Sequence, residues 1–362
     1  MPTEASRTLN QRQSMSLGAR RVFRLSLTVA LSLVIAYSMA LSMPYIVPIF
    51  ALMLTVAPSP PPKLKGLLVI VAVAALMTSS GLLIVPLLID YPASAVLVVL
   101  VALFLSNYIT VSVGQVMVGM LLTIGITLIS AIGTVSFFGA IVVIKALLSG
   151  IAIAVICQWV VYPLFPEDSA SPAPAPAPAA APASNENALW ISLRATLIVM
   201  PAYLACLTNP MMYMPLIMKT VALGQQSTVD DTNVAARTML GSTLMGGMIA
   251  VGFWFLLKIN VSLWMFFLGM LLITMVIAAK IYGVSASKYS ANFWSDAFVN
   301  MLILLGPAVA DSANGKDVYQ AFAVRMGLFV VVTIYASLTV LALDHLRASR
   351  RKKLAAALPP VI

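Results

Sequence analysis

The chain has 362 residues, of which 61% are hydrophobic and only 9% are charged, and its formal net charge is +10. Its mean hydropathy is +1.03. An ordinary soluble domain carries about 25% charged residues, so this composition excludes a water-soluble fold and predicts a polytopic membrane protein. The basic excess therefore has to be interpreted by its position along the chain, because basic residues report topology in membrane proteins.

The sequence also argues against several classes of chemistry. It has no Gly-x-x-x-x-Gly-Lys-Ser/Thr loop and no Gly-x-Gly-x-x-Gly within a soluble βαβ pattern, which excludes the usual ATP and dinucleotide sites. The one histidine, His345, lies near the C-terminal end, and Cys157 and Cys206 are isolated within apolar runs. We therefore predict no catalytic residues, no metal, no cofactor and no enzyme activity, and no nucleic-acid partner.

The apolar segments follow one another in two groups of six. Residues 1–22 form a basic N-terminus, residues 23–166 a first membrane repeat, residues 167–187 a Pro-Ala-rich linker, residues 188–345 a second repeat and residues 346–362 a basic tail. The predicted helices are 23–42, 44–57, 66–89, 92–111, 113–132, 136–163, 188–207, 209–224, 238–257, 261–281, 291–310 and 318–343. The linker composition is typical of an extended polyproline-II-like spacer. The predicted fold is thus all-α with about 12 transmembrane helices.

The positions of the basic residues predict the orientation. With the N-terminus inside, nearly all Lys and Arg residues between the helices fall on the cytoplasmic side, and Lys219 is counted among them. The outer side receives only Lys258 and Lys316. This asymmetry favours cytoplasmic N- and C-termini and a cytoplasmic linker.

Four pairs of segments indicate an internal repeat. RLSLTVALSL from Arg24 aligns with RATLIVMPAY from Arg194, and YIVPIFALML aligns with MYMPLIMKTV. KLKGLLVIVAVAAL aligns with RTMLGSTLMGGMIA, and IVVIKALLSGIAIAV with AFAVRMGLFVVVTIY, which places Lys145 opposite Arg325. Six helices per half make the two repeats parallel, related by a pseudo-twofold axis along the membrane normal.

Lys145 and Arg325 are the two cations that this topology leaves inside helices. They lie about 14 and 11 Å from the outer ends of their helices, at 1.5 Å per residue, close to the middle of a bilayer core of about 30 Å. One hypothesis is an anion-binding site at the interface of the repeats, because charges at this depth need a function or a partner. The alternative is that each side chain snorkels to an interface or pairs with a carboxylate.

Asp296 is the one carboxylate that the pattern places within the membrane, and Asn300 shares its helical face four residues later. Asp296 could couple proton movement to transport, or act as the counter-ion of Arg325. Alternatively, it lies in the first turns of its helix and faces cytoplasmic water, where a carboxylate is favourable.

Two short segments carry prolines at equivalent places, Pro48 in the second helix and Pro215 in the eighth. Paired short or proline-interrupted segments are typical of transporter binding sites, where freed backbone groups need polar partners. The simpler alternative is a tilted, kinked helix. Elsewhere, Ser242 and Gly246 are small residues four apart and predict close helix packing.

The stretch from Arg21 to Pro166 resembles an uncharacterised bacterial family, domain of unknown function 2955, which is related to fusaric-acid-resistance and aromatic-acid-exporter proteins. The resemblance rests on RRVFRLSLTVAL, PYIVPIFALMLTVAPSPPPKLKGLL, LLIDYPASAVLVVLVALFLSNY and QWVVYPLFP. In the second half, RTMLGSTLMGG is similar to an Arg-x-x-x-Gly-Thr-x-x-Gly pattern of the wider group. Ser242 replaces its threonine, and Met245 stands at the place of its last glycine.

The resemblance implies an inner-membrane efflux component for small organic anions such as aromatic carboxylates. It also implies partners in the form of a periplasmic adaptor of the membrane-fusion type and an outer-membrane channel; whether the chain forms a homo-oligomer stays open. A Pro-Ala tether replaces the cytoplasmic domain that larger relatives carry between their halves, which leaves the role of that domain in doubt here. Two alternatives remain: a divergent major-facilitator transporter, whose usual loop motif is replaced by SPPPKLKG, and a non-transporting membrane scaffold of an envelope complex.

Overall fold

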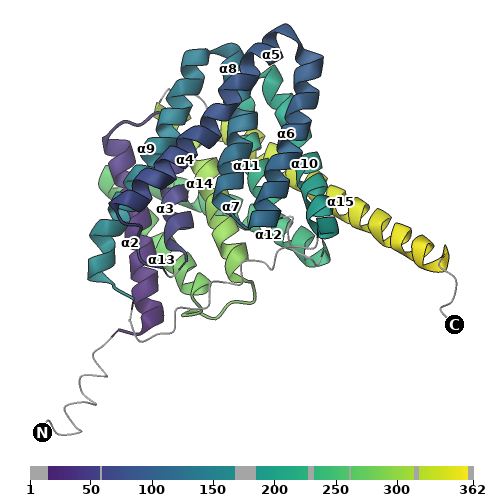
Figure 1. The fold of residues 1–362 in the computed structure, drawn as a ribbon. Helices are drawn as coiled ribbons and strands as arrows, with labels where there is room; N and C mark the ends of the chain where they lie inside the picture. Colours follow the sequence, from purple (N-terminus) through teal and green to yellow (C-terminus); the bar gives the residue numbers. More distant parts are fainter. Residues whose placement is uncertain are drawn as a thin grey trace, which may run out of the picture.

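A computed structural model describes residues 15–57, 59–167, 185–226, 232–260, 262–313 and 318–357. Regular structure in these ranges is helical throughout (Figure 1). The elements are α2 (Leu17–Ser38), α3 (Ile46–Thr55), α4 (Leu64–Ser79), η1 (Ser80–Ile84), α5 (Val85–Asp90), α6 (Pro92–Val113), α7 (Val116–Ile124), η2 (Gly125–Ile129), α8 (Ser130–Val135), α9 (Phe137–Val161), η3 (Tyr162–Leu164), α10 (Asn185–Thr208), α11 (Pro210–Gln226), α12 (Thr232–Ile259), α13 (Leu263–Ile281), α14 (Ala291–Ala313) and α15 (Val318–Ala357).

The helices confirm a multi-pass membrane protein. Within the described ranges, ten helices are long and apolar enough to cross a bilayer, and two shorter apolar helices occupy the second and eighth places. The ten residues of α3 extend about 15 Å and the seventeen of α11 about 25 Å, against a hydrocarbon core of about 30 Å. The expectation of short second and eighth segments is therefore confirmed.

Most predicted boundaries agree with the structure to within a few residues, and the larger differences lie at the two ends and at the start of α12, which begins six residues earlier than predicted, at Thr232. Helix α2 begins at Leu17, because the Ser16 hydroxyl caps it by accepting from the Ala19 N–H. Helix α15 continues to Ala357, through most of the segment predicted as a tail. The segments predicted at 1–22 and 167–187 fall mainly on residues outside the described ranges, and α10 has already begun at Asn185.

Local sequence sets several of the helix ends. Helix α6 begins at Pro92, whose missing N–H costs no hydrogen bond in a first turn. It ends at Val113, and the next residue, Gly114, caps it in the left-handed conformation, with φ 73°. Helices α9 and α13 begin after Ser136 and Ser262, whose hydroxyls accept from N–H groups of the first turn.

The two short helices lie at the centre of the bundle. Nearly every residue of α3 is buried, and so is the run from Pro215 to Val221 of α11. Helix α3 packs on α2, α9 and α14, whereas α11 packs on α7, α10, α14 and α15. In the same bundle, α2 packs on α13 and α6 packs on α10 (Figure 1), so helices from the two halves of the chain are in direct contact.

Close helix packing depends on glycine at several places, for example at Gly81 and Gly246. A Cβ on Gly81 would lie 1.8 Å from the carbonyl oxygen of Gly125, so η1 and η2 touch backbone to backbone. A Cβ on Gly246 would lie 2.5 Å from the Ala297 oxygen and 2.7 Å from Asn300 Cβ, which confirms the predicted packing role of this small residue against α14.

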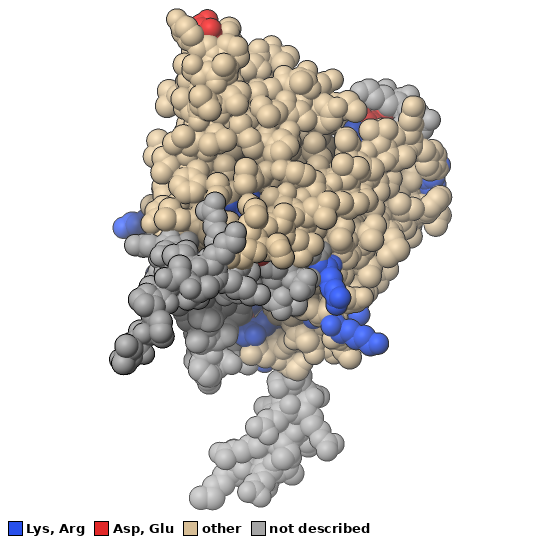
Figure 2. Space-filling model, turned by 90° about the vertical axis from the view of Figure 1, so that its right-hand side faces the viewer, with Lys and Arg blue, Asp and Glu red and all other residues tan. Residues whose placement is uncertain are grey.

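The surface is consistent with insertion into a membrane. Most of the surface in Figure 2 is uncharged: acidic atoms lie at the tip, a small group of acidic and basic atoms lies at the upper right, and most of the Lys and Arg atoms in view lie at the edges and lower down. Large apolar side chains are exposed along the long helices, for example Leu83 at 82% and Trp264 at 76%. Such exposure is costly in water but ordinary against lipid.

Candidate functional site

Lys219 is the most deeply enclosed charged side chain in the described part of the protein. It lies near the middle of α11 and has no solvent exposure. Its ammonium donates to Thr243 Oγ1 of α12 at 2.7 Å and to Asn300 Oδ1 of α14 at 2.8 Å. The three residues tie together three helices of the second half, and we call them the Lys219 cluster.

Neither direct partner of Lys219 is charged. Both are neutral oxygens, although the carboxylate of Asp296, one turn before Asn300 in α14, acts on the ammonium electrostatically. An ammonium has three N–H donors, and hydrogen bonds to described residues use two of them. An enclosed cation held in this way is costly, so its retention calls for a role beyond packing.

The rest of the cluster provides a second donor. Asn300 is 1% exposed, and its Nδ2 group is buried with no hydrogen-bond partner among the described residues. Thr243 Oγ1 is oriented by its own bond to the Met239 carbonyl and lies 3.3 Å from Thr333 Oγ1 of α15. The remaining N–H of Lys219 and the Asn300 amide are donors of the kind that a carboxylate accepts.

The structure does not bring the two predicted cations into one site. Lys145 is exposed on α9, and α9 packs on α2, α3, α4 and α8. Arg325 lies on α15, which packs on α10, α11, α12 and α14. The side of α9 that carries Lys145 therefore points away from the bundle, an arrangement that suits the snorkelling alternative.

Arg325 has a carboxylate partner, but it is Asp311 and not Asp296. Arg325 Nη2 lies 2.5 Å from Asp311 Oδ2, and both side chains are largely buried. Asp296 and Asp311 are fifteen residues apart in α14, about 22 Å along the helix. Arg325 Nη1 is buried without a hydrogen-bond partner among the described residues, and Arg325 acts electrostatically on Tyr45 of the first half.

The two predicted prolines differ in their local structure. Pro48 is the third residue of α3, in the first turn, where a missing N–H does not interrupt the helix. The expectation of an internal break at Pro48 is therefore wrong. Pro215 lies inside α11, four residues before Lys219, where it removes a backbone donor from the helix that carries the buried ammonium.

Two arginines at the beginning of the halves bind carboxylates near the end of the same half. Arg24 Nη1 lies 2.8 Å from Glu167 Oε2, and Arg194 Nη1 lies 3.0 Å from Asp344 Oδ2. Both arginine side chains are only 4% exposed. The sequence aligns the two arginines but gives no indication of their partners, which are about 145 residues away.

The environment of Glu167 has a definite electrostatic effect. Partial burial by itself disfavours the charged carboxylate, but hydrogen bonds and charge from Arg21 and Arg24 outweigh it and hold the pKa of Glu167 below its ordinary value. Glu167 is thus a carboxylate that stays ionised in the folded protein at neutral pH.

Sequence reasoning missed Lys219 as a site residue by assigning it to the cytoplasmic side. Its position at the tenth residue of seventeen in α11, with apolar residues on both sides, is the signal that could have identified it. Asn300, which the sequence pairs with Asp296, belongs to the cluster. No group of three or more metal-ligating side chains occurs within the described ranges.

Comparison with curated proteins and with solved structures gives no match. Residues 21–161 match the family described as Protein of unknown function (DUF2955). This range covers α2 through α9, and it agrees with the stretch in which the sequence resembles that family. Residues 21–161 are thus similar to this family.

Proposed function

We propose that this protein is an ATP-independent efflux transporter for small organic anions such as aromatic carboxylates, in a bacterial inner membrane. The observation that carries the proposal is the Lys219 cluster: an ammonium with no exposure, in the middle of a short central helix, whose hydrogen bonds to described residues all go to neutral oxygens. A cation in that position within a membrane bundle marks a pathway for ions or substrate more often than a structural bond.

Paired contacts support an arrangement of two parallel repeats. Helices α2 and α13 pack together, and so do their counterparts α10 and α6; η1 packs on η2 as α12 packs on α14. Arg24 bonds to Glu167 as Arg194 bonds to Asp344. In this arrangement the fourth helix of each half packs on the first helix of the other half. One half can then rock against the other around a central site.

The position of α11 supports binding close to the boundary between the halves. This helix carries Lys219 and packs on α7, η2 and α8 of the first half as well as on helices of the second. A carboxylate arriving from the cytoplasm would take the place of Asn300 Oδ1 as an acceptor for Lys219 and would also accept from Asn300 Nδ2. Both donors gain a charged acceptor in a dry environment, which strengthens each hydrogen bond.

Arg325 provides a second positive group along the outward path. Its bond to Asp311 neutralises most of its charge in this conformation, and its unbonded Nη1 offers one further donor. An anion that leaves Lys219 could compete with Asp311 for Arg325 before release. We assign Lys145 no part in this path, because its side chain is exposed on α9.

The membrane potential can drive such a cycle without ATP. Outward movement of one negative charge is favoured by about 2.3 kcal/mol per 100 mV, inside negative. The Asp296 carboxylate acts on Lys219 through its charge. A proton on this carboxylate would remove that negative charge and so strengthen the positive field that holds an anion. Asp296 is therefore the residue we propose for proton coupling. Partners would be a periplasmic adaptor and an outer-membrane channel.

The proposal can be tested by efflux of labelled benzoate from proteoliposomes under an imposed potential. The expected result is a potential-dependent efflux that Lys219→Met abolishes and that Lys145→Met, a matched neutralisation of an exposed lysine, leaves unchanged. Thr243→Val, which removes one oxygen with little change of shape, tests the cluster if Lys219→Met does not fold. Absence of efflux for every organic anion tried, with folded protein, would contradict transport and favour a membrane scaffold.

A further inference from the structure

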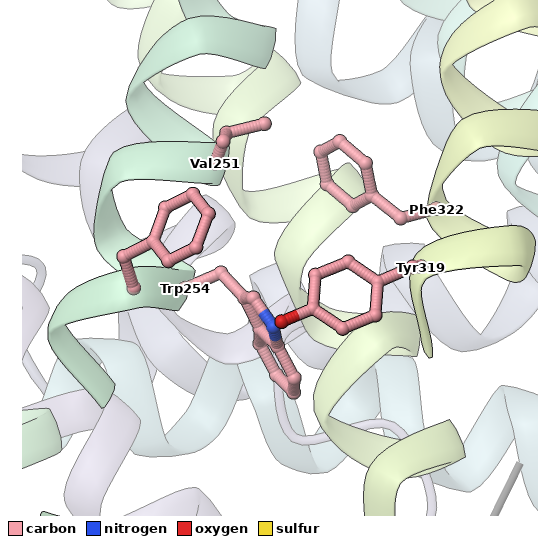
Figure 3. Close-up of a pocket in the computed structure, with 5 residues that line it drawn as sticks. Val251, Trp254, Tyr319 and Phe322 are labelled. Carbon is pink, nitrogen blue, oxygen red and sulfur yellow. The ribbon is translucent and has the colours of Figure 1, made fainter. Parts of the chain in front are cut away.

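A cavity of about 90 Å³ lies between α12 and α15. Val251, Trp254 and Phe255 line it from α12, and Tyr319 and Phe322 line it from α15 (Figure 3). The accessible lining is apolar, and apolar cavities of this kind stay dry or take up apolar guests.

The cavity opens towards the membrane rather than towards the interior of the bundle. Phe255 is 56% exposed, Tyr319 is 52% exposed and Val251 is 38% exposed. Both helices are candidate membrane spans whose surfaces are mostly unburied within the protein. The hydrocarbon available to such an opening is a lipid chain.

A cation stands at the end of this cavity. Lys258 follows Trp254 by one turn in the last turn of α12, its ammonium lies 4.5 Å from the centre of the Tyr319 ring, and it donates to the Tyr319 hydroxyl. Within the described ranges, no carboxylate forms an ion pair with it. Lys258 and the exposed Trp264 of α13 lie at helix ends, where aromatic and basic side chains typically meet lipid headgroups.

We propose that this cavity is a binding site for an anionic phospholipid, with one acyl chain between α12 and α15 and the phosphate on Lys258. The match is twofold: an apolar opening that faces the hydrocarbon, and a cation about one helical turn away towards the interface. A single phospholipid satisfies both because its chain and its phosphate are covalently joined. A small aromatic acid would reach the cavity only from the headgroup region and would leave the opening towards the hydrocarbon unfilled.

Native mass spectrometry of the full chain, released from detergent with added lipid, tests the site. Phosphatidylglycerol and phosphatidylcholine can be compared with identical chains: the first has a glycerol headgroup and a net negative charge, and the second has a cationic choline that cancels the charge of its phosphate. We expect one phosphatidylglycerol to be retained about fivefold more strongly than phosphatidylcholine, as one lysine near the lipid phosphate predicts. Lys258→Gln should remove that preference, whereas Lys145→Gln, a matched change on α9, should keep it.

A second variant separates the chain from the headgroup. Val251→Phe fills the cavity and should weaken retention of both lipids, whereas Leu97→Phe, at a position 65% exposed on α6, should weaken neither. Equal retention of the two lipids by the unchanged protein would overturn the proposal. So would a preference that survives Lys258→Gln, or displacement of the lipid by benzoate at the same site. These outcomes are independent of whether the protein transports anions.

Discussion

Arg194 in α10 and Asp344 in α15 lie 150 residues apart in sequence, and their side chains meet at 3.0 Å. The Trp190 indole N–H also donates to the same carboxylate, at 3.2 Å. The bond joins the first helix of the second half to its last helix, and the bond between Arg24 and Glu167 joins α2 to the segment that follows η3 in the first half. In each half, one largely buried arginine thus links the first helix to a carboxylate near the end of that half.

We predict that removal of the charge from Glu167 destabilises the protein. Glu167→Gln leaves the buried Arg24 guanidinium without its counter-ion, and breaking such a pair costs about 3 kcal/mol. The double variant Glu167→Gln, Arg24→Gln should be less destabilised than the sum of the single variants. Chemical unfolding in detergent would measure this coupling, and strictly additive effects would contradict it.

The same carboxylate predicts a dependence of stability on pH. Because the pKa of Glu167 is lower in the folded protein than its ordinary value, its contribution is complete above the ordinary pKa and is lost as the pH falls through the lowered folded value. The difference in Tm between the unchanged protein and Glu167→Gln should therefore be largest near neutral pH and shrink in acid. A difference that is constant from pH 7 to pH 3 would show that the carboxylate acts by shape and not by charge.

For the Lys219 cluster, we predict that one double variant loses efflux activity without losing stability. Replacing Lys219 by Met alone leaves Asn300 Oδ1 without its donor, but Lys219→Met combined with Asn300→Leu removes the enclosed polar groups together. Replacement of buried charged groups by apolar ones of similar volume is often neutral or stabilising. We expect the double variant to be at least as stable as the unchanged protein, by Tm, and inactive in efflux. Normal efflux from this variant would exclude the cluster as the binding site.

Helix α12 offers a matched pair of glycines. A side chain at Gly246 meets the α14 backbone, whereas a Cβ at Gly252 meets nothing within 4 Å. Gly246→Ala should separate α12 from α14 at Asn300 and cost about 1–3 kcal/mol, while Gly252→Ala should be neutral or stabilising by up to about 1 kcal/mol. Tm measurements on the two variants test this order. Equal shifts in Tm would show that the close contact at Gly246 contributes little to stability.

The helices could be predicted from the sequence because each span needs about 20 apolar residues, and this requirement is local. The site could not. The positions of the basic residues lead to a cytoplasmic assignment of Lys219, since nothing in the local pattern shows that helices of both halves enclose α11. The partners of Arg24 and Arg194 lie beyond any local window. For Lys145, α9 is apolar on every side, so the sequence has no polar face from which to infer its outward direction.

Asn300 and Pro48 also show that local sequence does not reveal tertiary contacts or helix starts. The spacing of Asp296 and Asn300 correctly places both residues on one side of a helix, and Asn300 bonds to a lysine that the pattern does not connect with it. Pro48 has the same sequence context as Pro215, yet it lies in a first turn because α3 begins only at Ile46. The start of a helix depends on caps and packing that alignment does not reveal.

The most direct test of the account is electrical. Solid-supported-membrane currents of the reconstituted protein would be recorded against a panel of aromatic and aliphatic carboxylates, with Lys219→Met and Lys145→Met compared at equal protein density. We predict currents for at least one class of carboxylate, lost in Lys219→Met and retained in Lys145→Met. Currents that persist in Lys219→Met, or no current across the panel from folded protein, would contradict an anion pathway through the Lys219 cluster.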